Sequence, residues 1–325
     1  MQRHRQSTAA TLQVAFTDEL GEAESRTTVT VGVTRANGEV LIAAGTPTAA
    51  GAGVGVFKKV LTPAQTSTLD TLTATWHDGD NDVDWITQHR IVGGFMFTIA
   101  QARAFDDVLA DEGTYPSAVI AAARSEVEND AEWICDRAFV PSYDRVTVDG
   151  DGSAQLMLGR HDLRRIRSVR VYESLDGDYT DLTAGELSSI ALLPGGVIRR
   201  TDGGVFRFGS SNVVVELEYG LDAPEDTMVT ASLLHLRSRL NITKTGVPDR
   251  ARELTTPQGN TYRLNGAEIF RTGIDAVDAV YDRFSLRAQS TGNAGDGSSS
   301  GEVLAASQTL SYDPQWYGLF RGGRR

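Results

Sequence analysis

The chain has 325 residues, of which 40% are hydrophobic and 23% charged, and its net charge is −12 at neutral pH. This length leaves room for two domains with buried cores. The negative charge argues against a protein that wraps nucleic acid, because that binding depends on neutralising phosphates with lysine and arginine. The single cysteine, Cys135, excludes an intramolecular disulfide framework, and we expect a small buried side chain in a reducing cytoplasm. Without a long apolar run or a basic-then-apolar leader, we expect neither a membrane span nor a signal peptide.

The first hundred residues are expected to form mainly β-strands. Residues 1–10 are basic, polar and small, and we interpret them as a flexible arm. Short alternating runs follow, with Asn37-Gly38 as a strong hairpin turn. About six or seven short strands with regular turn signals predict an immunoglobulin-like β-sandwich over residues 1–95. The expected strand segments are 28–34, 39–43, 53–61, 69–76 and 85–99.

Residues 115–150 carry the clearest pattern in the chain. Pro116 suits a first helical turn, and the apolar spacing after it predicts an amphipathic helix of about five turns. The apolar positions are Ile120, Ala123, Val127, Ala131 and Ile134. We expect the helix to end before Pro141, and residues 143–148 to alternate as a strand into the turn Asp149-Gly150-Asp151-Gly152.

The remaining elements are expected on both sides of this stretch. One short helix is predicted over residues 97–112, with Gly113-Thr114 as the break that follows it. Between residues 143 and 219 the pattern predicts further strands, with Gly/Asp turns at 176–178, 194–196 and 202–204, and further helices are expected at 224–240 and 274–284. Thr272 is the expected cap of the last helix, and residues 245–265 are interpreted as an extended loop. A Gly/Ser linker at 289–301 leads to an aromatic terminus.

This order of elements resembles the head-to-tail adaptor (connector) family of tailed bacteriophages. The resemblance is carried by the helix after Pro116, the Arg-Ala-Phe-x-Pro exit at 137–141, the strand into the 149–152 turn, and segments 156–158, 166–171, 213–226 and 272–280. The last segment is similar to the closing helix of actinobacteriophage members. In this family the first helix precedes a β-rich insertion, and later helices return to pack against it. The resemblance covers roughly residues 97–286, a little over half the chain.

The resemblance implies an α+β protein with three parts. An N-terminal immunoglobulin-like sandwich occupies residues 1–95, a helical adaptor core with a β-rich insertion occupies 96–286, and a flexible linker with an anchoring tail occupies 287–325. Several residues of the sandwich, such as 61–66 and 72–76, resemble immunoglobulin-like appendages of phages. The minimal adaptor does not include the sandwich.

The resemblance also implies a structural protein of the virion neck, without a cofactor and without enzymatic activity. It implies a homo-oligomeric ring, of about twelve copies, assembled in the bacterial cytoplasm without membrane contact. The ring docks on the portal protein, meets a stopper or tail-completion protein, and extends the DNA channel through which the genome is ejected. Genomic DNA passes through the lumen of the ring, where an acidic channel wall would repel the phosphates and let the DNA slide.

The C-terminal tail is the predicted portal anchor. A free tail in water has no reason to carry so many large apolar groups, and interface anchors are enriched in Trp, Tyr and Arg. We expect the tail to order on binding. The alternative is that its aromatic side chains fold back on their own subunit. The predicted portal-binding residues are Trp316, Tyr317, Leu319, Phe320, Arg321, Arg324 and Arg325.

A second candidate interface is the only basic cluster before the tail. Arginine binds carboxylates bidentately, so we expect this cluster to face a neighbouring subunit. Contact with DNA and a solvated face are the two alternatives. The predicted inter-subunit residues are Arg160, Arg164, Arg165 and Arg167, with Arg170 in the same cluster.

No catalytic or metal-binding constellation is evident. The five histidines lack metal-ligand spacing, and His161-Asp162 has no serine in a nucleophile elbow. The run DGDNDVD at 78–84 alternates carboxylates as calcium sites do. An EF-hand would need Gly at Val83 and Glu at His89, so an acidic solvated turn is the preferred interpretation and a sandwich-edge calcium site the alternative.

Two other function classes are considered. In a carbohydrate-binding or adhesin-like β module, Trp76 and Trp85 would stack on sugars, unless both belong to the sandwich core. An enzyme of unknown type is the third class, and the lack of an acid/base or metal constellation argues against it.

Overall fold

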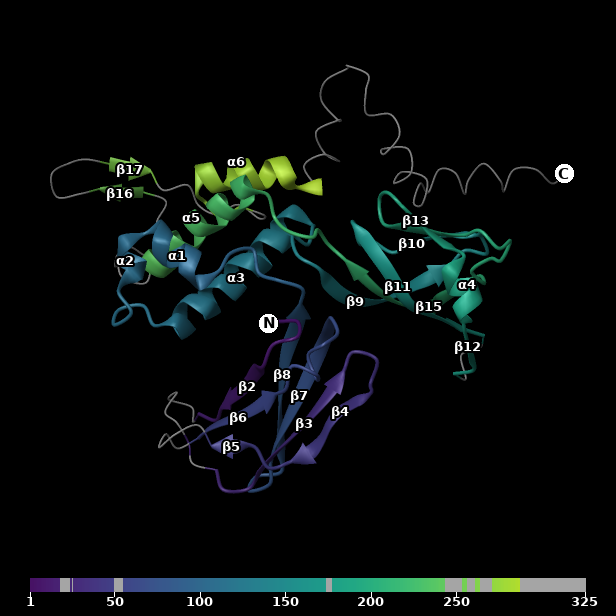
Figure 1. The fold of residues 1–325 in the computed structure, drawn as a ribbon, viewed down its shortest axis with the longest axis horizontal. Coiled ribbons are helices and arrows are strands. Elements are labelled where there is room, and N and C mark those ends of the chain that lie inside the picture. The colour runs from purple at the N-terminus through teal and green to yellow at the C-terminus, as the bar shows by residue number, and fades with distance from the viewer. Residues whose placement is uncertain are drawn as a thin grey trace, which may run out of the picture.

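The structure is a computed structural model that describes residues 1–17, 24, 26–49, 55–173, 177–242, 253–255, 261–263 and 271–286. These residues form an α+β fold, as predicted, with three separate hydrophobic cores. In Figure 1 a β-sandwich lies at the bottom, a group of helices lies at the upper left and a β-rich insertion extends to the right.

The N-terminal part consists of two sheets packed around one core. The alternation in strands such as β7 places every second side chain inside, where Trp76 is fully buried. The larger sheet has the order β1 (Gln2–Arg5), β8 (Val83–Val92), β7 (Asp70–Asp78), β3 (Val29–Arg35) and β4 (Val40–Gly45). The smaller sheet has the order β2 (Ala10–Ala15), β6 (Val56–Leu61) and β5 (Thr48–Ala49).

The prediction that residues 1–10 form a flexible arm is wrong. Strand β1 pairs in parallel with β8, so that Gln2 lies opposite His89 and Arg5 opposite Val92. The reason is that a parallel partner more than eighty residues away in the sequence offers hydrogen bonds and burial that local composition does not reveal.

The helical part surrounds α3 (Ser117–Cys135), which has 19 residues, in agreement with the predicted five turns. Its buried face is the predicted apolar one and packs against later helices, as the adaptor resemblance implies. Cys135 ends this helix and is fully buried, as expected. The other helices here are α1 (Ile99–Phe105), α2 (Asp107–Ala110), α5 (Asp226–Ile242) and α6 (Asp275–Phe284).

Three local expectations in this part need correction. The single helix over 97–112 is two helices, because Asp106 is extended and its carboxylate accepts the Val108 N–H as an N-cap at 2.9 Å. Helix α6 starts after Ile274, and Thr272 donates to the Asp278 carboxylate instead of capping the helix. The region expected as an extended loop contains a short hairpin, β16 (Glu253–Thr255) with β17 (Thr261–Arg263).

The insertion between α3 and α5 is built from two facing sheets. Strand β9 leaves α3 and β15 returns to α5, and apolar side chains of both sheets form the third core. One sheet has the order β12 (Tyr179–Asp181), β11 (Leu163–Tyr172), β15 (Gly209–Tyr219) and β9 (Ser142–Gly150). The other has the order β10 (Gln155–Met157), β14 (Val197–Arg200) and β13 (Ile190–Leu193), and α4 (Ala184–Ser188) precedes β13.

Candidate functional site

The sandwich, the helices and the insertion meet at a buried charged cluster centred on α3. Arg3 of β1 is only 3% exposed and donates to both carboxylate oxygens of Glu132, at 2.9 and 2.6 Å. Its Nε donates to Asn129 at 3.0 Å, and its Nη1 lies 3.5 Å from Glu128. The first strand of the chain is therefore fastened to the helix on which the helical core is built.

Arg90 of β8 extends the same cluster to the insertion. It donates to Glu132 at 3.0 Å and to the hydroxyl of Tyr219, at the end of β15, also at 3.0 Å. Burial acts to raise the pKa of Glu132, but Arg3 and Arg90 outweigh it and hold that pKa below its ordinary value. Glu132 is thus a largely buried carboxylate, with 12% of its side chain exposed, between two arginines, and it links all three parts of the fold.

Glu128 occupies a different environment one helical turn earlier. It accepts the Met96 N–H at 2.7 Å, and burial, only partly offset by Arg3, raises its pKa to about 7. Arg124 lies beside it, with its guanidinium 3.4 Å from the centre of the Phe95 ring. On the sequence, Glu128 and Arg124 lie between the apolar positions of α3, so their burial could not be predicted without the packing of residues 95–97 and β1 against this helix.

Two histidines add a second buried polar group to this junction. Nε2 of His4 lies 3.2 Å from Nδ1 of His89, and His89 also contacts Thr87, which accepts from the indole of Trp76. Burial lowers the pKa of each histidine to about 4, so both are neutral at pH 7. Because one ring must donate to the other, the pair functions as a neutral hydrogen-bonded unit within the sandwich core.

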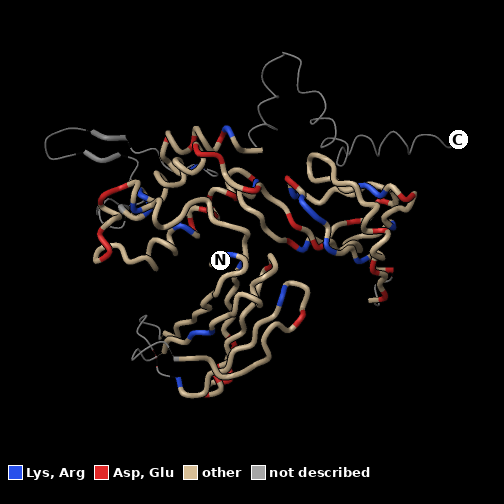
Figure 2. Tube along the Cα trace, in the orientation of Figure 1, with Lys and Arg blue, Asp and Glu red and all other residues tan. Residues whose placement is uncertain are grey.

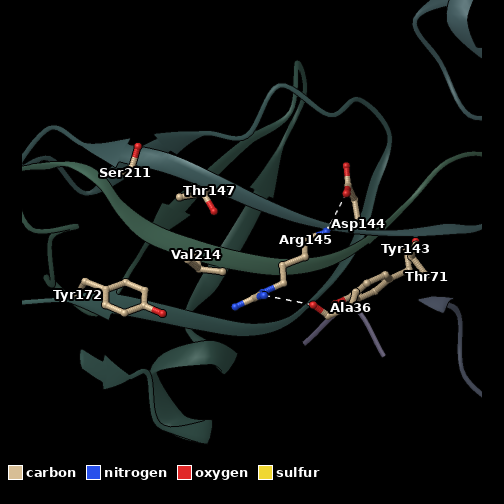
Figure 3. A pocket seen from close by; sticks show the side chains of 9 residues that line it. All are labelled: Ala36, Thr71, Tyr143, Asp144, Arg145, Thr147, Tyr172, Ser211 and Val214. Carbon is tan, nitrogen blue, oxygen red and sulfur yellow. Dashed lines mark hydrogen bonds between the residues drawn. The ribbon is translucent and has the colours of Figure 1, made fainter. Parts of the chain in front are cut away.

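A hollow of about 510 Å³ lies between the sandwich and the outer face of the insertion sheet. Figure 3 shows Arg145 of β9 crossing it to the Ala36 carbonyl, to which Nη1 donates at 3.1 Å. Tyr143, Thr147 and Tyr172 line the same face. Most of the lining side chains are polar, so the hollow has the character of a polar contact surface.

The arginines of the predicted cluster have different partners in the structure. Arg167 binds Glu218 at 2.7 Å and donates to the Leu69 carbonyl of the sandwich at 2.8 Å, so it holds two parts of one chain together. Arg170 binds Asp181 bidentately, at 2.8 and 3.1 Å. Arg160 and Arg164 bind Asp144 and Asp222. Arg165 is exposed and has no ion pair within the described residues. A role in contacts between subunits stays a prediction.

Charges of both signs alternate along the helices and the insertion, whereas the sandwich carries few of them (Figure 2). The acidic run 78–84 forms the β7–β8 turn, in which Asp80 accepts from Thr27 and Thr28 and buried Asp78 pairs with Arg26. Within the described ranges no three His, Cys, Asp or Glu residues gather as a metal site, and no helix is long and apolar enough to cross a membrane. Asp162 of the His161-Asp162 pair binds Arg137.

The other predicted site residues have different outcomes. Trp76 is fully buried in the sandwich core, so it cannot stack on sugars as the carbohydrate-binding alternative requires. Trp85 is 40% exposed and packs edge-on against Phe16, with ring centres 5.5 Å apart. The portal-anchor residues from Trp316 to Arg325 lie outside the described residues.

No protein-family model and no curated protein sequence matches the chain. Two similar solved chains come from the neck of an empty GTA particle and from the virion of a native gene transfer agent (GTA) particle. Each has a TM-score of 0.39 and 12% sequence identity, and each match covers 58% of this chain and 89% of the solved chain. A chain from the neck of a native GTA particle has TM-score 0.37 and 12% identity, covering 60% and 94%. Scores in this range do not establish a shared fold.

Proposed function

We propose that this chain is a structural protein of a virion neck, a head-to-tail adaptor that forms a ring on the portal. The observation that supports this proposal best is the return of α5 and α6 onto α3 after a β-rich insertion. Residues from all three helices share one core, in the order implied by the adaptor resemblance of the sequence. Order along the chain and packing in space therefore agree.

In this proposal the three parts have different roles. Residues 96–286 form the ring, the sandwich over 1–95 is a rigid appendage, and residues 287–325 reach the portal. Rigidity follows from the contacts of Arg3 and Arg90 with Glu132, since any shift of the sandwich relative to α3 would break these charge-assisted hydrogen bonds. A stopper or tail-completion protein binds the opposite side of the ring, and DNA passes through its lumen.

The test is reconstitution with the portal protein. Full-length protein should bind portal rings, and truncation after Gly301 should abolish binding while leaving the unfolding temperature nearly unchanged. The double variant Trp316→Ser and Phe320→Ser should also lose portal binding, because these side chains supply the apolar anchor. The matched control is Leu304→Ser, which removes an apolar side chain outside the aromatic segment and should retain binding.

Two results would contradict this proposal. If the full-length protein fails to bind portal and no ring appears at a particle neck by cryo-electron microscopy, the adaptor function is wrong. If the truncated protein binds portal normally, or unfolds at a clearly lower temperature, the anchor role of the tail is wrong. The carbohydrate-binding alternative keeps only Trp85 as an exposed sandwich tryptophan, and glycan-array screening of the full chain tests it.

A further inference from the structure

The insertion ends in an exposed aromatic tip, which we call the knob and define as Val205, Phe208, Asp149 and Asp151. Phe208 is 80% exposed and Val205 54%, so two apolar side chains stand in solvent at one loop. Gly209 pairs with Gly150, which places this loop beside the turn that carries both aspartates. Asp149 accepts from Ser210 and Ser211, and Asp151 accepts from Ser153. Neither carboxylate has an ion pair within the described ranges.

A hollow of about 280 Å³ lies at the other end of the same strands, beside α3. We call it the socket and define it by Trp133, Arg137, Arg160, His161 and Tyr219. Trp133 is 53% exposed, although the residues around it on α3 are largely buried. The hollow is also lined by the carboxylates Glu132 and Asp136, and Arg137 is already bound to Asp162. What the socket offers a partner is therefore an aromatic surface beside Arg160, and aromatic and arginine side chains are enriched at the centres of protein interfaces.

Arg160 gives the socket a specific chemistry. Its Nε donates to Asp144 at 2.5 Å, and its guanidinium lies 5.6 Å from the centre of the Tyr219 ring. Within the part of the chain that the structure describes, no hydrogen bond is made by its two Nη atoms. Those N–H groups are available to an incoming carboxylate, which arginine binds more strongly than a neutral acceptor.

The knob cannot fill the socket of its own chain. Strand β15 runs through 11 residues from Gly209 at the knob to Tyr219 at the socket. At about 3.3 Å per residue the two ends are roughly 33 Å apart. Two complementary patches at opposite ends of one subunit produce head-to-tail contacts, which close into rings when the rotation allows it.

We propose that the knob of one copy docks in the socket of the next copy and that this contact builds the ring. Phe208 packs against Trp133, and Asp149 or Asp151 binds the free Nη groups of Arg160. The occupant is a second copy because the knob carries an exposed aromatic side chain together with carboxylates that have no ion pair within the described residues, and these can bind the Nη groups of Arg160. This inference rests on the proposed ring and names the surfaces that form it.

Cross-linking tests the contact while Phe208 and Trp133 both remain unchanged. Arg207→Cys marks the knob and His161→Cys marks the socket, while native Cys135 is fully buried and does not react. With a short bis-maleimide on portal-bound protein, a mixture of the two variants should give dimers, each variant alone should give none, and the double variant should give a ladder. The matched control, Val40→Cys on the exposed edge of the sandwich, should give no product with His161→Cys.

A second substitution checks that the contact depends on the knob itself. Phe208→Ser should reduce the cross-linked yield about tenfold, as loss of an aromatic anchor does. It should keep the wild-type unfolding temperature, because the Phe208 side chain is in solvent. Unchanged yield in this variant, or dimers of Arg207→Cys alone, would overturn the head-to-tail contact. If rings assemble without the knob–socket product, the inference fails and the adaptor function stands; if no ring assembles on portal at all, the adaptor function fails.

Discussion

Replacing Arg3 by alanine should lower the free energy of unfolding by about 3 kcal/mol. The change removes two short hydrogen bonds to Glu132, one to Asn129 and a longer contact with Glu128. Removing one member of a buried ion pair costs about 3–5 kcal/mol, because the remaining charge is left without its partner in a dry environment. The lower end of this range applies here, since Arg90 still binds Glu132 at 3.0 Å.

Thermal unfolding monitored by circular dichroism measures the effect. At an unfolding entropy of about 2.1 cal/mol/K per residue, a loss of 3 kcal/mol corresponds to a decrease of about 4–5 °C for a chain of 325 residues. The matched control is Arg5→Ala, on the same strand with an exposed side chain, which should change the stability by less than about 0.5 kcal/mol. Glu132→Gln combined with Arg3→Ala should cost less than the sum of the single changes, because the two residues share one interaction.

Equal effects of the Arg3 and Arg5 substitutions would refute the reasoning. That result would mean that β1 contributes no more through its buried arginine than through its exposed one, and that the N-terminal segment does not fasten the sandwich to α3. Additive effects in the double variant would refute the specific pairing with Glu132 in the same way.

Three further predictions concern buried titratable groups. His4 and His89 have folded pKa values near 4, below the ordinary 6.5, so the unfolded chain binds protons more tightly than the folded one. The free energy of unfolding should therefore fall by about 2 kcal/mol for each histidine as pH falls from 7 to 5. In urea unfolding, His4→Gln combined with His89→Gln should make this dependence on pH weaker. Glu128 has the opposite sign, since its folded pKa of about 7 lies above the ordinary 4.5, so stability falls as pH rises between these values, and Glu128→Gln should gain about 2 kcal/mol relative to wild type from pH 5 to pH 7. An unchanged difference across that range would contradict the burial of this carboxyl group. Burial raises the pKa of Cys135 to about 12, so a thiol reagent followed by mass spectrometry should label it only after unfolding.

Local periodicity was sufficient to predict most helices of the helical part and the β-rich character of the insertion, whereas β12, α4, β13 and β14 were not predicted individually. The apolar spacing after Pro116 identifies α3 and its buried face, and alternation identifies β9, because spacings of 3.6 and 2 residues report directly which face is buried. Strand β15 was expected from the family resemblance, and its residues from Asn212 to Val215 are buried in succession. The lone Cys135 was expected to be buried, and it is. The break at Asp106 was missed because a capping aspartate interrupts a run whose apolar spacing is continuous.

Other features depend on partners that are distant in the sequence. Arg3 and Glu132 are 129 residues apart, and a basic, polar N-terminus gives no local sign that it pairs in parallel with β8. Arg167 was grouped with its neighbours by sequence, yet packing assigns it to Glu218 and to a carbonyl of the sandwich. The knob and the socket likewise depend on the tertiary structure, because the paired strands β9 and β15 place Phe208 at one end of the insertion and Trp133 beyond the other. Burial, ion pairing and exposure are properties of assembled surfaces, so they follow from the tertiary structure and not from the order of residues within one segment.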